Sequence, residues 1–183
     1  MLLVVDNGSV YTKSLLDFLI HKKITFNTLP FDKVILSELH KYSSIILSGR
    51  TINIALMNAT NSKIIRHAVL EKTPLLGICY GAEILALTLG GTIKKMDKSH
   101  NGIQEIEVLQ PNPICKNKIK VFESHSYLVS KLDSCFEQIA KSGYCKYEIF
   151  QYANHKIFGT QFHPEMSDDG KLLLEKFITI QQF

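Results

Sequence analysis

Cys79 stands between two glycines in the sequence GICYG, residues 77–81, directly after the short apolar run of residues 75–78. Small residues on either side of a nucleophile allow the backbone to turn sharply from a strand into a helix, so that the side chain projects from the turn. An apolar helical stretch, Ala82 to Leu89, follows. A helix N-terminus favours the thiolate, which is the nucleophilic form of cysteine. The pattern predicts a nucleophilic Cys79, and a buried structural cysteine in an ordinary strand–helix turn is the alternative.

A second stretch, QFHPE at residues 161–165, contains the groups that a nucleophilic cysteine needs. The cysteine requires a base that takes and returns a proton, and the base requires a third group that fixes its orientation. His163 and Glu165 are two residues apart and point the same way on an extended chain, with Pro164 stiffening the backbone between them. Together with Cys79, they predict a Cys–His–Glu triad.

The elements that must position these residues alternate between strand and helix in the first half of the chain. Apolar runs and helical periodicity predict strands at residues 2–5, 24–29, 44–47 and 75–78, and helices at 11–21, 34–40, 62–71 and 82–89. Such alternation predicts a parallel sheet with helices on both faces. Ligands bind at the carboxyl ends of the strands in such sheets. The turns at residues 6–9, 48–51 and 79–81 all fall at that edge.

The second half consists of short β-like runs separated by turns, before a final helix at residues 171–178 that Asp168 or Asp169 caps. These runs predict an antiparallel extension of the same sheet. We therefore expect a single domain over residues 1–183, an α/β fold with a mostly parallel open sheet flanked by helices. The β-like runs are residues 92–95, 103–109, 119–123, 136–140, 148–152 and 156–160.

Composition excludes several classes of function. The net charge is +4, and the basic residues are scattered over the chain, which argues against a nucleic-acid-binding surface. No stretch approaches the roughly 18 apolar residues of a membrane span. The four cysteines form no C-x-x-C pair and have no zinc spacing, so no metal site is expected. We expect a cytoplasmic protein with reduced thiols, although a Cys135–Cys145 disulfide stays open.

The two motifs, in the order Cys–His–Glu, resemble the class I glutamine amidotransferases, whose glutaminase domain is flavodoxin-like. The resemblance runs nearly end to end. Within that family, the chain is most similar to the glutaminase subunit of GMP synthase. The segments that carry this similarity are DNGS at 6–9, LSG at 47–49, LGICYG at 76–81, LALTLGG at 85–91, ESH at 123–125 and FGTQFHPEMS at 158–167. His-Ser at 125–126 is also similar to a loop of the anthranilate and aminodeoxychorismate synthase subunits.

The resemblance implies that Cys79 attacks the side-chain amide of L-glutamine, that His163 serves as base and then acid, and that Glu165 orients it. Backbone N–H groups of Tyr80 and Arg50 would form the oxyanion hole. The substrate-binding residues would be Gly49, Glu83 and a loop formed by Ser124, His125, Ser126 and Tyr127. The resemblance implies no cofactor for this chain. The ammonia would pass to a separate ATP-dependent subunit that aminates XMP, and ATP and Mg would be needed only there.

Three positions depart from the family pattern. The family loop S-G-G-P reads Ser48-Gly49-Arg50-Thr51 here, Glu83 stands where Gln is usual, and Tyr127 stands where the GMP synthase pattern has Asp. These departures leave three interpretations: an ordinary glutaminase, a hydrolase of another γ-glutamyl or amide substrate, and a catalytically silent or partner-activated subunit. The acceptor of the ammonia, the need for a partner and the oligomeric state stay open.

Overall fold

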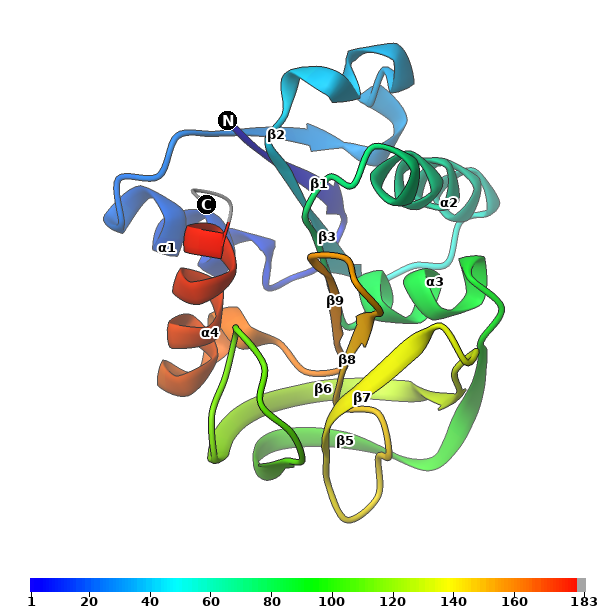
Figure 1. The fold of residues 1–183 in the computed structure, drawn as a ribbon, viewed down its shortest axis with the longest axis vertical. Helices are drawn as coiled ribbons and strands as arrows, with labels where there is room; N and C mark the ends of the chain where they lie inside the picture. Colours follow the sequence, from blue (N-terminus) through cyan, green and yellow to red (C-terminus); the bar gives the residue numbers. More distant parts are fainter. Residues whose placement is uncertain (181–183) are drawn as a thin grey trace.

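The computed structural model describes residues 1–180, in which nine strands form one sheet in the order β2-β1-β3-β4-β9-β8-β7-β5-β6 (Figure 1). Residues 181–183, the end of the predicted domain, lie outside the described residues. The strands are β1 (Leu2–Asn7), β2 (Phe26–Pro30), β3 (Ser44–Arg50), β4 (Leu75–Ile78), β5 (Thr92–Val108), β6 (Lys118–Lys131), β7 (Phe136–Lys141), β8 (Ile149–Tyr152) and β9 (Ile157–Thr160). The helices are α1 (Thr12–His21), α2 (Ala55–Leu70), α3 (Tyr80–Thr88) and α4 (Asp168–Thr179), and short 3-10 turns cover Phe31–Lys33, Leu36–Lys41 and Pro164–Met166.

The sheet has a parallel and an antiparallel half, as the sequence predicts. The pairs β2–β1, β1–β3, β3–β4 and β4–β9 are parallel. The pairs β9–β8, β8–β7, β7–β5 and β5–β6 are antiparallel. Strands β4 and β9 are adjacent, with Ile78 paired to Thr160. This pairing brings the turn after β4, with Cys79, beside the turn after β9, with His163.

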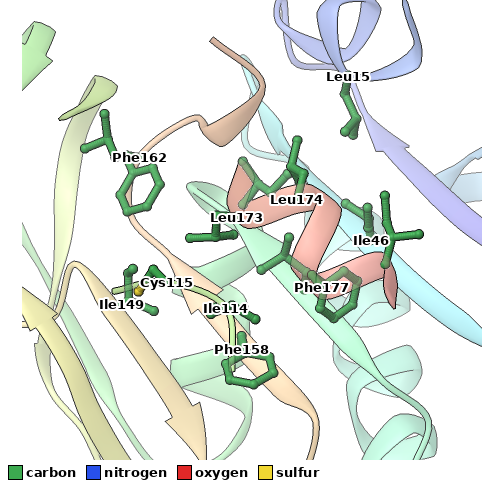
Figure 2. Packing of buried hydrophobic residues seen from close by; sticks show 14 of the residues in the cluster. Leu15, Ile46, Ile114, Cys115, Ile149, Phe158, Phe162, Leu173, Leu174 and Phe177 are labelled. Carbon is green, nitrogen blue, oxygen red and sulfur yellow. The ribbon is translucent and has the colours of Figure 1, made fainter. Parts of the chain in front are cut away.

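Helices cover both faces of the parallel half, with α1 and α4 on one side and α2 and α3 on the other (Figure 1). Alternate residues of β1 pack into the two hydrophobic cores on either side of the sheet, because successive strand side chains point to opposite faces. Leu2 and Val4 belong to the α1–α4 core, and Leu3 and Val5 belong to the α2–α3 core. Burying each such side chain contributes about 1.5–3 kcal/mol. Figure 2 shows the first core, where side chains of α4 gather beside Ile46 and Phe158.

Three predicted helices differ in the structure. Helix α4 begins at Asp168 and is capped by Ser167, whose side chain accepts a hydrogen bond from the Gly170 N–H, so the expected cap at Asp168 or Asp169 is wrong.

Helix α2 begins at Ala55, seven residues before the predicted start at Ser62. The prediction missed its first two turns because they bury few apolar side chains and therefore show no helical periodicity. The predicted helix at residues 34–40 is wrong. Only Leu39 of Leu36–Lys41 is buried, and the segment forms a 3-10 turn instead of an amphipathic α-helix.

The antiparallel half also corrects two expectations. Residues 124–127, predicted as a loop, belong to β6, because Ser124 pairs with Asn101 and His125 pairs with His100 across the β5–β6 hairpin. The predicted runs 92–95 and 103–109 are parts of the single long strand β5. All four cysteines lie within residues 1–180 and are free there, so the open Cys135–Cys145 pairing is absent from the structure.

Candidate active site

Cys79 occupies the turn between β4 and α3 in a strained backbone conformation, with φ 51° and ψ −104°. L-residues rarely adopt positive φ, and such strain gathers at functional sites. The backbone N–H of Cys79 donates a 2.7 Å hydrogen bond to the carbonyl of Thr160, the last residue of β9. This bond attaches the predicted nucleophile directly to the strand that leads to His163.

The glycines on either side of Cys79 are required by close backbone contacts. A Cβ on Gly77 would lie 2.4 Å from the carbonyl oxygen of Gly81, and a Cβ on Gly81 would lie 2.4 Å from that of Leu47. Real Cβ atoms essentially never come within 3.0 Å of a heavy atom from a residue that is not a chain neighbour, so neither position accepts a side chain without movement of the backbone. The G-x-C-x-G spacing therefore reflects how closely the elbow packs against itself and against β3.

His163 and Glu165 form a buried pair, with the His163 Nδ1 atom 2.9 Å from the Glu165 Oε1 atom. A carboxylate accepts a hydrogen from Nδ1, which leaves Nε2 as the ring nitrogen that accepts a proton from a nucleophile. The Tyr11 ring packs against the imidazole with 4.5 Å between ring centroids. On another side, a Cβ on Gly49 would come within 2.9 Å of the His163 Cε1 atom. The His163 imidazole is thus held by a carboxylate, an aromatic ring and a glycine.

The environment of Cys79 opposes ionisation of the free thiol. Burial raises the pKa of Cys79 well above its ordinary value, and the charge of Glu83 adds to this effect. The backbone N–H of Tyr80 and the charge of Arg50 lower the pKa, but less strongly. The expectation that a helix N-terminus would favour the thiolate is therefore outweighed by burial. The thiol needs a base to remove its proton, which is the role predicted for His163.

Arg50 lies over the Tyr80 ring, with its guanidinium carbon 4.1 Å from the ring centroid. Its Nη1 atom donates to Asn58 Oδ1 at 3.1 Å, and the Tyr80 hydroxyl donates to the same oxygen at 2.8 Å. Arg50 is not among the described non-glycine residues with positive φ, so it needs no glycine-like conformation here. The Arg50 side chain is accommodated by a network of its own.

Glu83 is 95% buried, one helical turn after Cys79 on α3, and its carboxyl lies in the fields of Arg50 and His125. Burial raises the pKa of Glu83 to about 7, although both of these cationic groups act to lower it. The negative charge of the Glu83 carboxyl in turn raises the pKa of Cys79. Glu83 and Arg50, the two departures from the family pattern, therefore belong to one charged environment around the thiol.

Strand β6 supplies the wall opposite the elbow. The Ser124 carbonyl oxygen lies 4.0 Å from the Cys79 sulfur. Ser126 is exposed, and Tyr127 is 41% exposed. The His125 ring is occupied by protein partners, because Nε2 lies 2.8 Å from Glu123 Oε2 and Nδ1 lies 2.8 Å from the Tyr127 carbonyl. The structure thus brings Ser124 to Cys79, whereas the His125 side chain turns toward Glu123.

Several residues at the site carry no sequence signal. Asn61 on α2 donates to Asn7 Oδ1 at 2.7 Å, and Asn7 Nδ2 donates to the Ser48 carbonyl at 3.0 Å. These buried amides connect the C-terminal part of β3, through Asn7 at the end of β1, to α2. Asn58, whose side-chain oxygen accepts hydrogen bonds from Arg50 and Tyr80, belongs to the same helix. Asn58 and Asn61 lie before the predicted helix start, and only the non-local packing shows what they contact.

Within residues 1–180, no group of three or more His, Cys, Asp or Glu side chains is arranged to hold a metal ion. No helix in the same part of the chain combines the length and apolar character needed to cross a membrane. The groups gathered around Cys79 are a thiol, an imidazole, a carboxylate and backbone N–H donors, which together suit nucleophilic acyl transfer.

The model of the family Glutamine amidotransferase class-I matches residues 3–180. The chain belongs to the class I glutamine amidotransferase family. It is 34% identical over 190 aligned positions to a glutamine-hydrolysing GMP synthase subunit of Pyrococcus furiosus, with 98% of each chain covered. An enzyme that hydrolyses glutamine is therefore the class to which this amidotransferase belongs.

Solved structures agree with this assignment. A Thermoplasma acidophilum protein described as a GMP synthase subunit superposes with a TM-score of 0.88 at 28% identity, covering 99% of this amidotransferase and 93% of that chain. A glutamine amidotransferase of Thermotoga maritima, 19% identical, shares the fold with a TM-score of 0.80 over 98% of this chain and 96% of its own. The predicted family and fold class are confirmed.

Proposed function

We propose that this amidotransferase is the glutamine-hydrolysing subunit of a two-subunit GMP synthase. Cys79, His163 and Glu165 form its triad, L-glutamine is its substrate, and the ammonia passes to a separate ATP-dependent subunit that aminates XMP. The observation that carries the proposal is the buried His163–Glu165 pair beside the Cys79 elbow, at the ends of adjacent strands. Nearly complete coverage of a relative named as one subunit of a GMP synthase supports the choice of partner.

The first half of the reaction begins with the Cys79 thiol, which the pocket keeps protonated. His163 Nε2 takes the thiol proton as the sulfur bonds to the side-chain amide carbon of glutamine. The negative charge then rests on the former carbonyl oxygen, which accepts hydrogen bonds from the N–H groups of Tyr80 and Arg50. One such donor contributes about 3 kcal/mol to the transition state. The C–N bond breaks as the nitrogen takes the proton from His163. Ammonia departs, and a glutamyl thioester remains on Cys79.

The second half hydrolyses the thioester. His163 removes a proton from a water molecule as its oxygen attacks the thioester carbon, and the C–S bond breaks. The proton returns to the Cys79 sulfur and glutamate is released. Throughout, Glu165 holds the imidazole by Nδ1 and stabilises the positive charge that the ring acquires twice. The reaction uses only groups of this chain and water, so we propose that the hydrolytic half needs no cofactor.

The first experiment is reaction with an electrophilic glutamine analogue, read by intact mass on the wild-type chain and on Cys79→Ala. Cys115→Ala is the matched control, since Cys115 is a buried free thiol on the loop before β6. We expect one adduct on the wild type and on the control variant, and none on Cys79→Ala. Glutaminase activity that survives Cys79→Ala would overturn the assignment of the nucleophile.

The partner is tested separately. With glutamine as the nitrogen source, we expect GMP from XMP and ATP only when Mg²⁺ is supplied together with the ATP-dependent subunit, and none with Cys79→Ala. Free ammonium should restore GMP formation in the mixture that contains Cys79→Ala. Failure with glutamine, together with success with ammonium, would contradict transfer of ammonia from this chain.

Glu83 favours a second candidate, the hydrolysis of another γ-glutamyl compound. A buried carboxyl stands where the family pattern has an amide, and its charge acts on the thiol. A panel of γ-glutamyl amines compared with glutamine tests this candidate. A kcat/KM at least tenfold higher for one of these amines than for glutamine would favour it over the glutaminase. Activity with neither class, unless the synthetase subunit is present, would identify a partner-activated subunit.

A further inference from the structure

A second His–Glu pair lies behind the pocket wall and continues into a second acidic side chain. Glu123 and His125 on β6 are bonded at 2.8 Å, and both side chains are 99% buried. Glu148, directly before β8, has no exposed surface. Neither of its carboxyl oxygens receives a hydrogen bond from a donor among residues 1–180, and neither does Glu123 Oε1. Buried carboxyl oxygens without donors are rare, so this group calls for a physical account.

The Tyr144 O–H group lies beside Glu123 as one donor, and one proton between the two carboxyls supplies a donor for the Glu148–Glu123 pair. Burial and the charge of Glu123 raise the pKa of Glu148 to about 9, so Glu148 is neutral at pH 7 and carries an O–H group. Burial alone would raise the pKa of Glu123, but the hydrogen bond with His125 and the nearby O–H groups of Tyr144 and Glu148 hold this pKa below its ordinary value. Glu148 therefore donates to an ionised Glu123, which is the arrangement expected when two carboxyls share one buried site.

The proton count extends to the histidine. His125 Nδ1 faces the Tyr127 carbonyl and Nε2 faces the Glu123 carboxylate, both of which are acceptors. A ring between two acceptors carries a hydrogen on each nitrogen and is cationic. The result is a chain of a neutral acid, a carboxylate and an imidazolium: Glu148, Glu123 and His125. We refer to these three residues as the buried proton chain.

The buried proton chain flanks and hydrogen-bonds the β6 segment that faces Cys79. Ser124 lies between Glu123 and His125 in sequence, and its carbonyl is the group 4.0 Å from the Cys79 sulfur. The bond from His125 to the Tyr127 carbonyl closes the far end of this segment. The charge of His125 also acts on Glu83, the carboxyl that opposes ionisation of Cys79. The hydrogen bonds of these residues thus hold the pocket wall in place, and the charge of His125 lowers the pKa of Glu83 in the pocket.

We propose that Glu123, His125 and Glu148 are positioning residues for glutamine binding, and that the proton on Glu148 keeps the 124–127 wall in its binding geometry. This inference rests on the proposed function, because it assigns the wall to glutamine. Loss of that proton leaves two carboxylates facing each other in a buried site. Repulsion then turns Glu123 away from His125 and releases the wall.

The experiment compares Glu148→Gln, whose amide N–H group can still donate to Glu123, with Glu148→Ala, which leaves Glu123 without that donor. At pH 7.5 we expect Glu148→Gln to keep the KM for glutamine within about threefold of the wild type, and Glu148→Ala to raise it at least tenfold, with kcat changed less than KM. Glu137→Gln, at an exposed position on β7, is the control for loss of a carboxyl.

The pH profile separates positioning from simple packing. The groups that act on Glu148 are Glu123 from β6, and Ser142, Tyr144 and Cys145 from the β7–β8 turn. We expect the KM of the wild type to rise, relative to that of Glu148→Gln, as pH passes 9. The substrate's own amino group titrates in both reactions and cancels in this ratio. Equal KM values for the Ala and Gln variants, or parallel pH profiles for wild type and Gln variant, would overturn the proposal.

Two further measurements do not depend on glutamine turnover. Alkylation of Cys79 by iodoacetamide, mapped by peptide mass, should change several-fold in Glu148→Ala and remain at the wild-type rate in Glu148→Gln. The stability of the wild type in urea should fall more steeply from pH 7 to 10 than that of Glu148→Gln. If the wild type hydrolyses no glutamine, the proposed function fails, and these two results still decide whether the buried proton chain holds the wall. If Glu148→Ala does not fold, Glu123→Gln takes its place, since its amide loses the charge that His125 requires.

Discussion

The backbone N–H of His163 donates a 2.8 Å hydrogen bond to the carbonyl of Phe122 on β6. This isolated bridge joins the turn that carries the proposed base, His163, to the strand that carries Ser124. The bond from Cys79 to Thr160 makes the matching connection on the other side. Backbone bonds therefore attach the 160–163 segment to β6 at His163 and to the Cys79 turn at Thr160.

Gly81 offers a test of how tightly the elbow must pack. We expect Gly81→Ala to destabilise the protein by about 1–3 kcal/mol, because the added methyl group meets the Leu47 carbonyl 2.4 Å away and the backbone must shift. Urea unfolding measures the loss, and glutamine hydrolysis should fall with it because the shift displaces Cys79. Gly143→Ala is the control, because its Cβ would meet nothing within 4 Å. Equal stability of the two variants would contradict the packing argument.

Glu165 is expected to contribute mainly to the rate. Glu165→Gln keeps an oxygen near His163 Nδ1 but removes the charge that stabilises the imidazolium and fixes its tautomer. We expect kcat to fall roughly 10²- to 10⁴-fold while KM changes little. Steady-state glutaminase assays measure both constants, with Glu105→Gln on the exposed side of β5 as the control. A loss that appears only in KM would show that Glu165 acts on binding.

The sequence predicts the parallel half of the sheet well because its strands are continuous apolar runs between helices. Leu2–Val5 and Leu75–Ile78 are buried on both faces, and no other local structure suits such runs. The positions of Cys79 and of the QFHPE motif could be predicted for a related reason, since Cys79 directly follows the run Leu75–Ile78 and QFHPE directly follows the run Ile157–Thr160. Local pattern and tertiary position agree at these points.

The remaining features depend on contacts that the local sequence does not encode. Strand β5 is mostly exposed and polar. Residues 96–102 therefore show no alternation of apolar and polar side chains from which their pairing with β6 could be predicted. The local pattern overstates the acidity of Cys79, because a helix N-terminus is a local feature, whereas burial and the charge of Glu83 arise from the packed protein. Glu148 has an ordinary sequence context, and only the fold places it against Glu123.

Glu83 should make stability depend on pH. Its pKa in the folded chain is about 7, above the ordinary value of 4.5, so its proton stabilises the fold below pH 4.5 and this contribution is lost as pH rises through 7. The loss amounts to up to about 3 kcal/mol. We expect Glu83→Gln to be the more stable chain at pH 8 and to show a shallower decline from pH 5 to 8 in urea unfolding. Parallel stability curves would contradict a buried, protonated Glu83.

The same substitution should increase the reactivity of Cys79. The Glu83 carboxylate opposes the thiolate, so Glu83→Gln removes one cause of the raised pKa. We expect alkylation of Cys79 by iodoacetamide at pH 8 to accelerate several-fold, with the pH profile moved to lower pH. Glu71→Gln, at the exposed end of α2, is the control. An unchanged profile would mean that burial alone governs the thiol.

Arg50 and Glu83 are expected to act as a pair. Arg50 lies over Tyr80 and lowers the pKa of Glu83, so Arg50→Gly should reduce glutamine turnover by leaving a buried carboxyl without its cation. We expect kcat/KM to fall at least tenfold in Arg50→Gly and to recover to within about threefold of wild type when Glu83→Gln is added. With kcat/KM unchanged in Glu83→Gln alone, this is a coupling of at least about 0.7 kcal/mol. The matched cycle uses Arg66→Ala, an exposed cation on α2, which should be additive with Glu83→Gln. Additivity in both cycles, with turnover unchanged in the Arg50→Gly, Glu83→Gln double variant, would identify the two departures as neutral drift around an intact triad.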